Sequence, residues 1–114
     1  MFFGKDIDPI SPNEILDLWF DFVKDVDEGD EVVSAEFRLE ALAAENGATL
    51  DPNPSSRLVG SPAIEPSEFD GERDLKAIQR VSGLQLGTRY RLFCLATTAS
   101  GAKPEGWYRF WCRT

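Results

Sequence analysis

The 114-residue chain has no histidine, only two cysteines and no long hydrophobic run. Without histidine there is no imidazole to act as a general base or to activate a serine or cysteine nucleophile. Two cysteines alone fall short of the four ligands of a structural zinc site. No apolar segment approaches the roughly 18 residues of a membrane-spanning helix, and the first ten residues lack the basic start and apolar stretch of a secretory signal. We therefore expect neither an imidazole-based enzyme, nor a zinc protein, nor a membrane partner.

Basic residues are scarce in the first two thirds of the chain. Residues 1–75 hold 19 acidic and 5 basic residues, a net charge of −14, whereas residues 76–114 hold 1 and 7, a net charge of +6. The total of −8 repels phosphate backbones, so nucleic acid is not expected as a partner. Two explanations of the asymmetry are open. Acidic and basic strands pair across one sheet, or subunits meet acidic face to basic face.

The many carboxylates offer little recognisable chemistry. The acidic run DVDEGD at residues 25–30 lacks the twelve-residue spacing of a calcium-binding loop and fits a solvated turn with Gly29 in the left-handed conformation. No glycine-rich loop with the spacing of a phosphate-binding site is present. A hydrolase with paired carboxylates stays formally open, but no segment suggests a deep cleft. We expect no catalytic residues, no metal and no cofactor.

Alternation of apolar and polar residues is the main structural signal, and it predicts a mostly β chain. In residues 15–23 the side chains of Leu16, Leu18, Phe20 and Phe22 share one face. In residues 32–41 we expect Val33, Ala35, Phe37 and Leu39 to point inward. Further strands are expected at residues 75–81, 90–98 and 107–113, with turns and short strands in the Pro- and Gly-rich residues 46–71.

The segment VSGLQLGTRYRLFCLATTASG, residues 81–101, carries a corner motif. Leu84, Gly87 and Tyr90 lie at three-residue intervals, and the alternation of a strand begins at Tyr90. This spacing is typical of the tyrosine corner of immunoglobulin-like and fibronectin type III sandwiches, in which the hydroxyl fastens the preceding crossover. The other explanation is a strand that begins with tyrosine in a different antiparallel sheet. We predict a single immunoglobulin/fibronectin-III-like antiparallel β-sandwich over residues 14–114.

The first 13 residues contain Pro9 and Pro12 and are predicted to form an extended N-terminal arm. Phe2 and Phe3 are unusual in such an arm, because a free tail gains nothing from two exposed aromatic rings. They either pack back on the sandwich or dock on a neighbouring subunit.

The closing hairpin predicts where the two cysteines lie. If its loop centres on Lys103, Cys94 lies opposite Cys112 and both point inward. Directly opposed cysteines on neighbouring strands form strained disulfides, so two buried free thiols are expected. Free thiols also suit a protein made in a reducing cytoplasm.

The outer face of the same hairpin is unusually rich in arginine and tryptophan. These residue types dominate binding hot spots, so a protein partner is one explanation for the face. The other is that a loop or the arm covers it, with arginines stacked on the indole rings. Trp19 joins this face if the first strand belongs to the same sheet. The predicted interface is Phe2, Phe3, Trp19, Arg89, Arg91, Phe93, Trp107, Arg109, Trp111 and Arg113.

The segments KDIDPISPNEILDLWFDF, GDEVVSAEFRLE and LQLGTRYRLFCLATTASG together resemble a family of small Ig-like virion proteins of tailed bacteriophages, the fibre–tail adaptor proteins. The resemblance covers both ends of the chain, whereas residues 45–75 match poorly. The matching positions are Lys5, Asp6, Asp8, Pro9, Leu16, Asp17, Asp21, Gly29, Asp30, Gly87, Tyr90, Thr97, Thr98 and Gly101.

This resemblance implies a non-enzymatic structural protein of the virion, made in the host cytoplasm and placed at the tail, the neck or the join between tail and fibres. It implies multiple copies in a symmetric assembly, other virion proteins as partners, and no cofactor. Two alternatives remain. One is a capsid decoration or cement protein, and the other is a monomeric Ig-like module that binds protein or carbohydrate.

Overall fold

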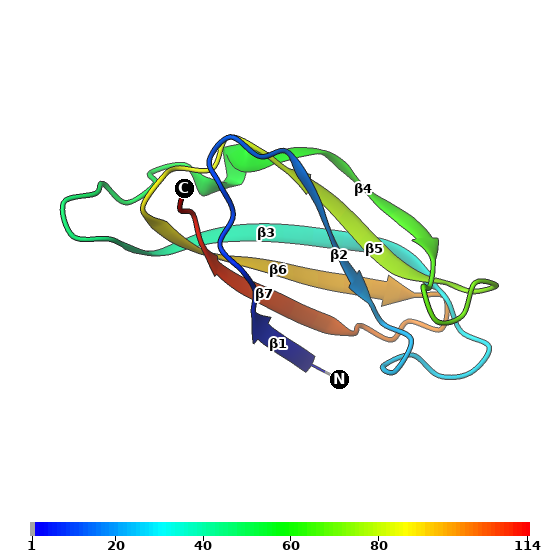
Figure 1. The fold of residues 1–114 in the computed structure, drawn as a ribbon. Helices are drawn as coiled ribbons and strands as arrows, with labels where there is room; N and C mark the ends of the chain where they lie inside the picture. Colours follow the sequence, from blue (N-terminus) through cyan, green and yellow to red (C-terminus); the bar gives the residue numbers. More distant parts are fainter. Residues whose placement is uncertain (1) are drawn as a thin grey trace.

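Two β-sheets pack face to face in the computed structural model, which describes residues 2–114 and leaves the side chains of Phe2 and Phe3 outside its described part (Figure 1). The sheets have the strand orders β1-β7-β6-β3 and β2-β5-β4, and the body measures 50 × 22 × 21 Å. The predicted all-β sandwich is confirmed. Its elements are β1 (Phe2–Asp6), β2 (Leu16–Asp21), β3 (Val32–Ala44), the 3₁₀ helix η1 (Pro54–Arg57), β4 (Leu58–Pro66), β5 (Asp74–Val81), β6 (Thr88–Thr98) and β7 (Glu105–Trp111).

Alternate residues of the strands fill the space between the sheets. Every second residue of β6 is buried, beginning with Thr88 and Tyr90, as the alternation predicts. Phe20 of β2 has no exposed surface and stacks on Tyr108 of β7 across the sandwich, with 4.1 Å between ring centroids. Burying a side chain of this size stabilises the fold by about 1.5–3 kcal/mol. The period-two pattern therefore both forms the strands and holds the two sheets together.

Tyr90 fastens the crossover between β5 and β6. Its hydroxyl accepts a hydrogen bond of 2.8 Å from the backbone N–H of Gln85, and Leu84 beside it is buried. Gly87 has φ = +83°, and a Cβ there would lie 2.8 Å from the Cβ of Ala48. Both the left-handed backbone and the close approach require glycine. This is the geometry that the spacing of leucine, glycine and tyrosine predicts.

A buried carboxylate completes this corner. Asp51 is 3% exposed, and its Oδ2 accepts a hydrogen bond of 2.7 Å from the hydroxyl of Tyr90. Its two oxygens also accept from the guanidinium of Arg57 at 3.0 and 3.1 Å, and Oδ1 accepts from the N–H of Asn53 at 2.9 Å. Burial by itself raises the pKa of Asp51, but these donors outweigh it and hold that pKa below its ordinary value. The connection between β3 and β4 is thereby attached to the corner.

One residue of β3 departs from its predicted face. Val33 was expected to point inward, yet it is 60% exposed, while Val32 is 3% exposed. Val32 pairs with Thr98 and Ser34 with Thr97, so Val33 is the additional residue of a β-bulge. A bulge reverses the alternation on one side of it, which explains the difference. The other predicted inward residues, Ala35, Phe37 and Leu39, pack against the core.

The closing hairpin turns three residues earlier than predicted. Its loop centres on Ser100 instead of Lys103, because the N–H of Gly101 donates to the carbonyl of Thr98 at 3.0 Å and Gly101 takes φ = +93°. Cys94 consequently pairs with Gly106, so the predicted pairing with Cys112 is wrong. The difference in register is even, so every side chain keeps its predicted face. Both thiols are buried and free, as predicted.

The N-terminal segment is an edge strand of the first sheet, where an arm had been expected. β1 runs parallel to β7, with Phe2 aligned with Glu105 and Asp6 with Arg109. Further along, Ile10 is 4% exposed, and its N–H donates to the carbonyl of Trp111, the last residue of β7, at 3.0 Å. The described part of residues 1–13 therefore packs along the sandwich. What the side chains of Phe2 and Phe3 contact lies outside the described part.

The charge asymmetry of the sequence corresponds to positions in the sheets. The first four strands are the four sheet edges, and β5, β6 and β7 are the interior strands. Acidic edge strands and loops therefore flank a basic interior, which supports the first explanation of the asymmetry. Six basic residues from the last part of the chain make ion pairs to carboxylates of the first 75 residues: Lys76, Arg80, Arg89, Arg91, Arg109 and Arg113.

Candidate protein-binding face

The outer face of the first sheet gathers most of the arginine and aromatic residues that the sequence predicts to share one side. Paired residues of antiparallel strands project to the same face of a sheet, so the pairing of β6 with β7 decides which side chains meet. The aligned pairs are Arg89 with Trp111, Arg91 with Arg109, and Phe93 with Trp107. We call these six residues, together with Arg113 after the end of β7, the Arg–Trp face.

Guanidinium groups lie over the aromatic rings of this face. Arg113 and Arg89 lie 4.6 and 5.6 Å from the ring centroid of Trp111. Arg109 lies 5.3 Å from the ring of Trp107. Such contacts stabilise by about 0.5–1 kcal/mol each at exposed sites. The alternation of arginine and tryptophan thus produces a stacked arrangement along β7.

Carboxylates from both edge strands hold the arginines in place. Asp6 of β1 accepts two hydrogen bonds from Arg109, at 2.6 and 3.1 Å, and lies 3.7 Å from Arg89. Glu40 of β3 lies 3.4 Å from Arg91. The hydrogen bond from Arg109 holds the pKa of Asp6 below its ordinary value despite partial desolvation. The face is therefore organised before any partner arrives.

Trp107 lies against the edge strand β1. Gly4 of β1 is aligned with Trp107, and a side chain at Gly4 would overlap the indole ring. β1 widens the sheet at this point and lies beside the face, so it does not form a third layer over it (Figure 1). The side chains of Arg89, Arg109 and Arg113 remain 33%, 35% and 46% exposed. The Arg–Trp face is thus partly covered by its own side chains and otherwise open among the described residues.

Trp19 does not belong to this face. β2 lies in the second sheet, so the indole projects from the opposite side of the sandwich and the predicted grouping is wrong for this residue. Trp19 is 40% exposed, with Nζ of Lys76 5.2 Å from its ring. Its backbone carbonyl accepts a hydrogen bond of 2.7 Å from the hydroxyl of Tyr108.

Four residues that flank the Arg–Trp face, on the neighbouring strands β1 and β3, were missed at the level of the sequence. In β3, Glu36, Arg38 and Glu40 alternate outward, and Arg38 lies 4.8 Å from the ring of Phe93. That alternation was a usable signal for Arg38 and Glu40. No local pattern indicates Gly4 or Asp6, because their position depends on the parallel pairing of strands from opposite ends of the chain.

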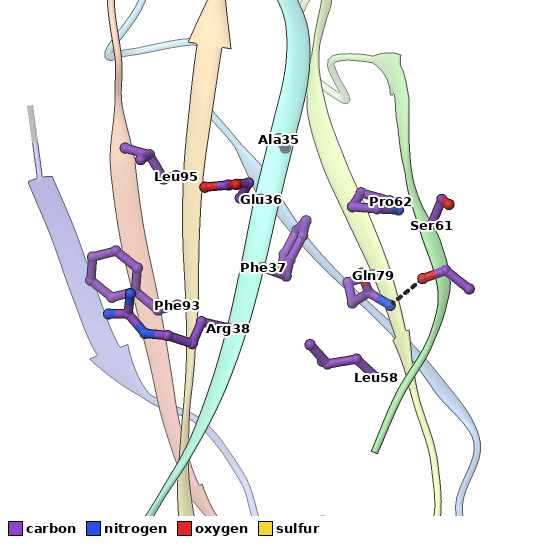
Figure 2. Close-up of a pocket in the computed structure, with 11 residues that line it drawn as sticks. Ala35, Glu36, Phe37, Arg38, Leu58, Ser61, Pro62, Gln79, Phe93 and Leu95 are labelled. Atoms are coloured by element: carbon purple, nitrogen blue, oxygen red, sulfur yellow. Dashed lines mark hydrogen bonds between the residues drawn. The ribbon is translucent and has the colours of Figure 1, made fainter. Parts of the chain in front are cut away.

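A groove of about 560 Å³ runs along the open side of the sandwich between β3 and β4 (Figure 2). Phe37 projects from β3 into this space toward Leu58, Gln79 and Pro62, whereas Arg38 and Phe93 lie on the other side of β3. Gln79 is 2% exposed, and its amide donates to the carbonyls of two residues of the β4 bulge at 3.1 and 3.2 Å. The lining of the groove therefore mixes apolar side chains, such as Phe37 and Leu58, with polar and charged ones, such as Gln79 and Glu36.

The two thiols offer no reactive nucleophile at neutral pH. Burial raises the pKa of Cys94 to about 12, and burial with the nearby charge of Glu14 raises the pKa of Cys112 to about 11. Within residues 2–114 no three His, Cys, Asp or Glu side chains gather as metal ligands. In the same residues there is no helix of the length and apolarity that a membrane crossing requires.

Comparisons with known proteins found no family model that matches this chain and no matching curated protein.

Proposed function

We propose that this chain is a non-enzymatic structural protein of a tailed-bacteriophage virion and that it connects tail or neck components in the manner of a fibre–tail adaptor. The resemblance of its two ends to such proteins supports the assignment to a virion. The observation that carries the binding role is the Arg–Trp face: two tryptophans, one phenylalanine and four arginines on the paired strands of one sheet. These residue types supply the largest share of binding free energy in many protein interfaces.

The strand order supports the immunoglobulin-like part of the resemblance. With β2, β5 and β4 taken as strands B, E and D, and with β3, β6 and β7 taken as C, F and G, the two sheets correspond to the BED and CFG groups of a constant-type immunoglobulin sandwich. β1 then lies beside strand G as an additional edge.

The residues that carry the resemblance are mainly structural. Gly29 and Gly101 have φ values of +86° and +93° in the turns before β3 and before β7. Asp30 accepts a hydrogen bond from the hydroxyl of Ser100 and another, of 3.1 Å, from the N–H of Ser100. The hydroxyls of Ser100 and Thr98, helped by backbone N–H donors, lower the pKa of Asp30 to about 2. Positions of this kind specify turns and the corner of a sandwich. The choice of partner depends on other residues, above all those of the Arg–Trp face.

The organisation of the face favours binding as a preformed surface. Stacking and ion pairs already restrict the rotamers of Arg89, Arg109 and Arg113 before contact. Association therefore costs less than the roughly 0.5–1.5 kcal/mol that each freely rotating side chain would lose. Arginine side chains next to aromatic rings suit a partner with carboxylates, carbonyl groups and apolar side chains, as the surfaces of neighbouring virion proteins provide.

Trp111→Ala tests this proposal, with Trp19→Ala as the matched control on the opposite sheet. Both variants remove one partly exposed indole, but only Trp111 belongs to the Arg–Trp face. Each variant is supplied in trans to a phage that lacks the native gene, and its copy number in purified particles is measured by mass spectrometry. We expect at least a tenfold loss of incorporation for Trp111→Ala and native incorporation for Trp19→Ala.

Circular dichroism of the purified variants checks that both remain folded. Equal incorporation of the two variants would contradict the proposal for this face. A copy number in the hundreds would favour a decoration protein over a tail or neck connector. Absence of the native chain from purified particles would contradict the virion role altogether.

A further inference from the structure

Of the four sheet edges, β3 alone among the described strands combines length with a long stretch that has neither proline nor bulge. β1 has 5 residues, and the exposed edge of β2 is closed at Trp19 by the hydroxyl of Tyr108. β4 contains Pro62 and Pro66 and a bulge. β3 has 13 residues and no proline, and its pairing with β6 is regular from Ser34 to Ala41. Natural proteins blunt sheet edges with short strands, prolines and bulges, so an unblunted edge suggests a pairing site.

The free hydrogen-bonding groups of β3 can be assigned from its neighbour. Ala96 and Thr98 of β6 donate their N–H groups toward the β7 side, to the carbonyls of Pro104 and Ala102. The hydrogen bonds of a strand alternate between its two sides, so the intervening residues of β6 bond to β3. Their partners on β3 are Ser34, Glu36, Arg38 and Glu40. The N–H and C=O groups of Ala35, Phe37 and Leu39 therefore point to the open edge.

We infer that this edge pairs with β3 of a second copy of the chain, antiparallel, with Phe37 on the two-fold axis. In this register Ala35 of each copy hydrogen-bonds with Leu39 of the other, and Phe37 with its own counterpart. The pairing spans Ser34 to Glu40, which lies inside the bulge-free stretch. The two Phe37 rings then meet at the groove between β3 and β4, into which Phe37 already projects (Figure 2).

The charges of β3 are complementary to themselves in this register. Glu36 of each copy lies opposite Arg38 of the other, in a pair without backbone hydrogen bonds, where the side chains approach most closely. Sliding one strand by two residues instead places Arg38 opposite Arg38 and Glu36 opposite Glu40, which is repulsive. A slide of four residues restores opposite charges but runs into the bulge between Ala41 and Ala43. The sequence of β3 thus favours one antiparallel register.

A contact of seven residues from each copy is small for a stable dimer, so we expect a dissociation constant in the micromolar range. Its biological meaning rests on the proposed function, because a virion component is held next to its neighbours and a weak pairing then suffices. The β3 edge and the Arg–Trp face are different surfaces, so one copy can pair with another while its face contacts a third protein.

The test uses sedimentation velocity of the native chain and three variants over about 0.1 μM to 1 mM, a range that brackets a micromolar dissociation constant. The native chain should dimerise with increasing concentration. Arg38→Glu puts a glutamate opposite Glu36 at both symmetry-related positions, and it should weaken the dimer at least tenfold. The double variant Glu36→Arg/Arg38→Glu exchanges the charges and should restore it. The double variant Glu40→Arg/Arg38→Glu leaves the clash with Glu36 in place and should not.

A native chain that stays monomeric throughout this range overturns the inference, as does a dimer that Arg38→Glu leaves unchanged. Rescue by the Glu40 double variant in place of the Glu36 double variant overturns the register. Arg38 is 65% exposed, so all variants are expected to fold, which thermal melting verifies. Sedimentation involves no virion, so a negative result here leaves the particle-incorporation test of the proposed function unaffected.

Discussion

Tyr90→Phe removes one oxygen atom from the corner and should be among the most destabilising conservative changes in the chain. The Tyr90 ring has no exposed surface, and phenylalanine preserves its packing in the core. The substitution takes away both hydrogen bonds of the hydroxyl. The N–H of Gln85 loses its acceptor, and the buried carboxylate of Asp51 loses one donor.

The size of the effect follows from what is left unpaired. A buried N–H without an acceptor costs about 1–3 kcal/mol, and a hydrogen bond to a charged group contributes about 1.5–3 kcal/mol. Asp51 keeps its hydrogen bonds from Arg57 and Asn53, so losing the bond from Tyr90 should cost about 1.5 kcal/mol, the lower end of the range for a charged group. Together these terms predict a loss of about 2.5–4.5 kcal/mol. A domain of this size has about 5–15 kcal/mol of stability in total, so the loss is a large fraction of it.

Urea denaturation followed by tryptophan fluorescence measures this loss, and Tyr108→Phe is the control. Tyr108 also lies in the sandwich, where it is half-buried, and it donates a single hydrogen bond to the carbonyl of Trp19. Losing this hydrogen bond in Tyr108→Phe should lower the free energy of unfolding by about 0.5–1.5 kcal/mol, the ordinary net value of one hydrogen bond. Both variants should keep the native dependence of free energy on urea, because the surface exposed on unfolding does not change.

A Tyr90→Phe variant that is no less stable than Tyr108→Phe would refute this account of the corner. So would a crystal structure of the variant in which the segment before β6 keeps its position with a water molecule in place of the hydroxyl and stability unchanged. In either case the Leu-x-x-Gly-x-x-Tyr spacing would reflect packing alone.

Three further predictions follow from the same structure. Desolvation raises the pKa values of Tyr90 and Tyr108 to about 12. The stability that this shift contributes is complete below pH 10 and is lost as the pH rises through 12. Urea denaturation should therefore give a lower free energy of unfolding at pH 11 than at pH 9, and Tyr90→Phe should reduce the difference. Gly87→Ala should cost about 2 kcal/mol or more, because φ is +83° and the new Cβ meets Ala48, whereas Gly71→Ala, with open space around it, should cost less than about 0.5 kcal/mol in the same denaturation assay. Cys94 and Cys112 should resist a thiol reagent at pH 8 in the native protein and react at once in urea, and rapid native reaction of either would contradict their burial and raised pKa values.

Local patterns were sufficient to predict much of the fold. The alternation of Phe20 and Phe22 in β2, and of Tyr90 and Leu92 in β6, reports directly which face is buried, because strand geometry imposes a period of two. The corner was predictable because its leucine, glycine and tyrosine are close in sequence. The residues on the outward face of β6 and β7 were predicted correctly although the hairpin register was wrong, because the register differs by an even number of residues.

Features that depend on distant pairing could not be predicted. The parallel alignment of β1 with β7 joins the two ends of the chain, and it decides that Asp6 binds Arg109. Asp51 lies in a Pro-rich connection with no periodicity, so nothing local indicates its burial beneath Tyr90. The bulge at Val33 inserts one residue without any proline or glycine to mark it. In the same way, the sequence did not decide which sheet contains Trp19.

A cryo-electron microscopy map of the assembled particle, at a resolution that shows side chains, would reveal whether the Arg–Trp face binds a neighbour. We expect a neighbouring virion protein to lie against the outer face of β6 and β7 and to contact Trp111 and Arg109. A map in which that face is turned to solvent, while the chain is held through other surfaces, would contradict this expectation.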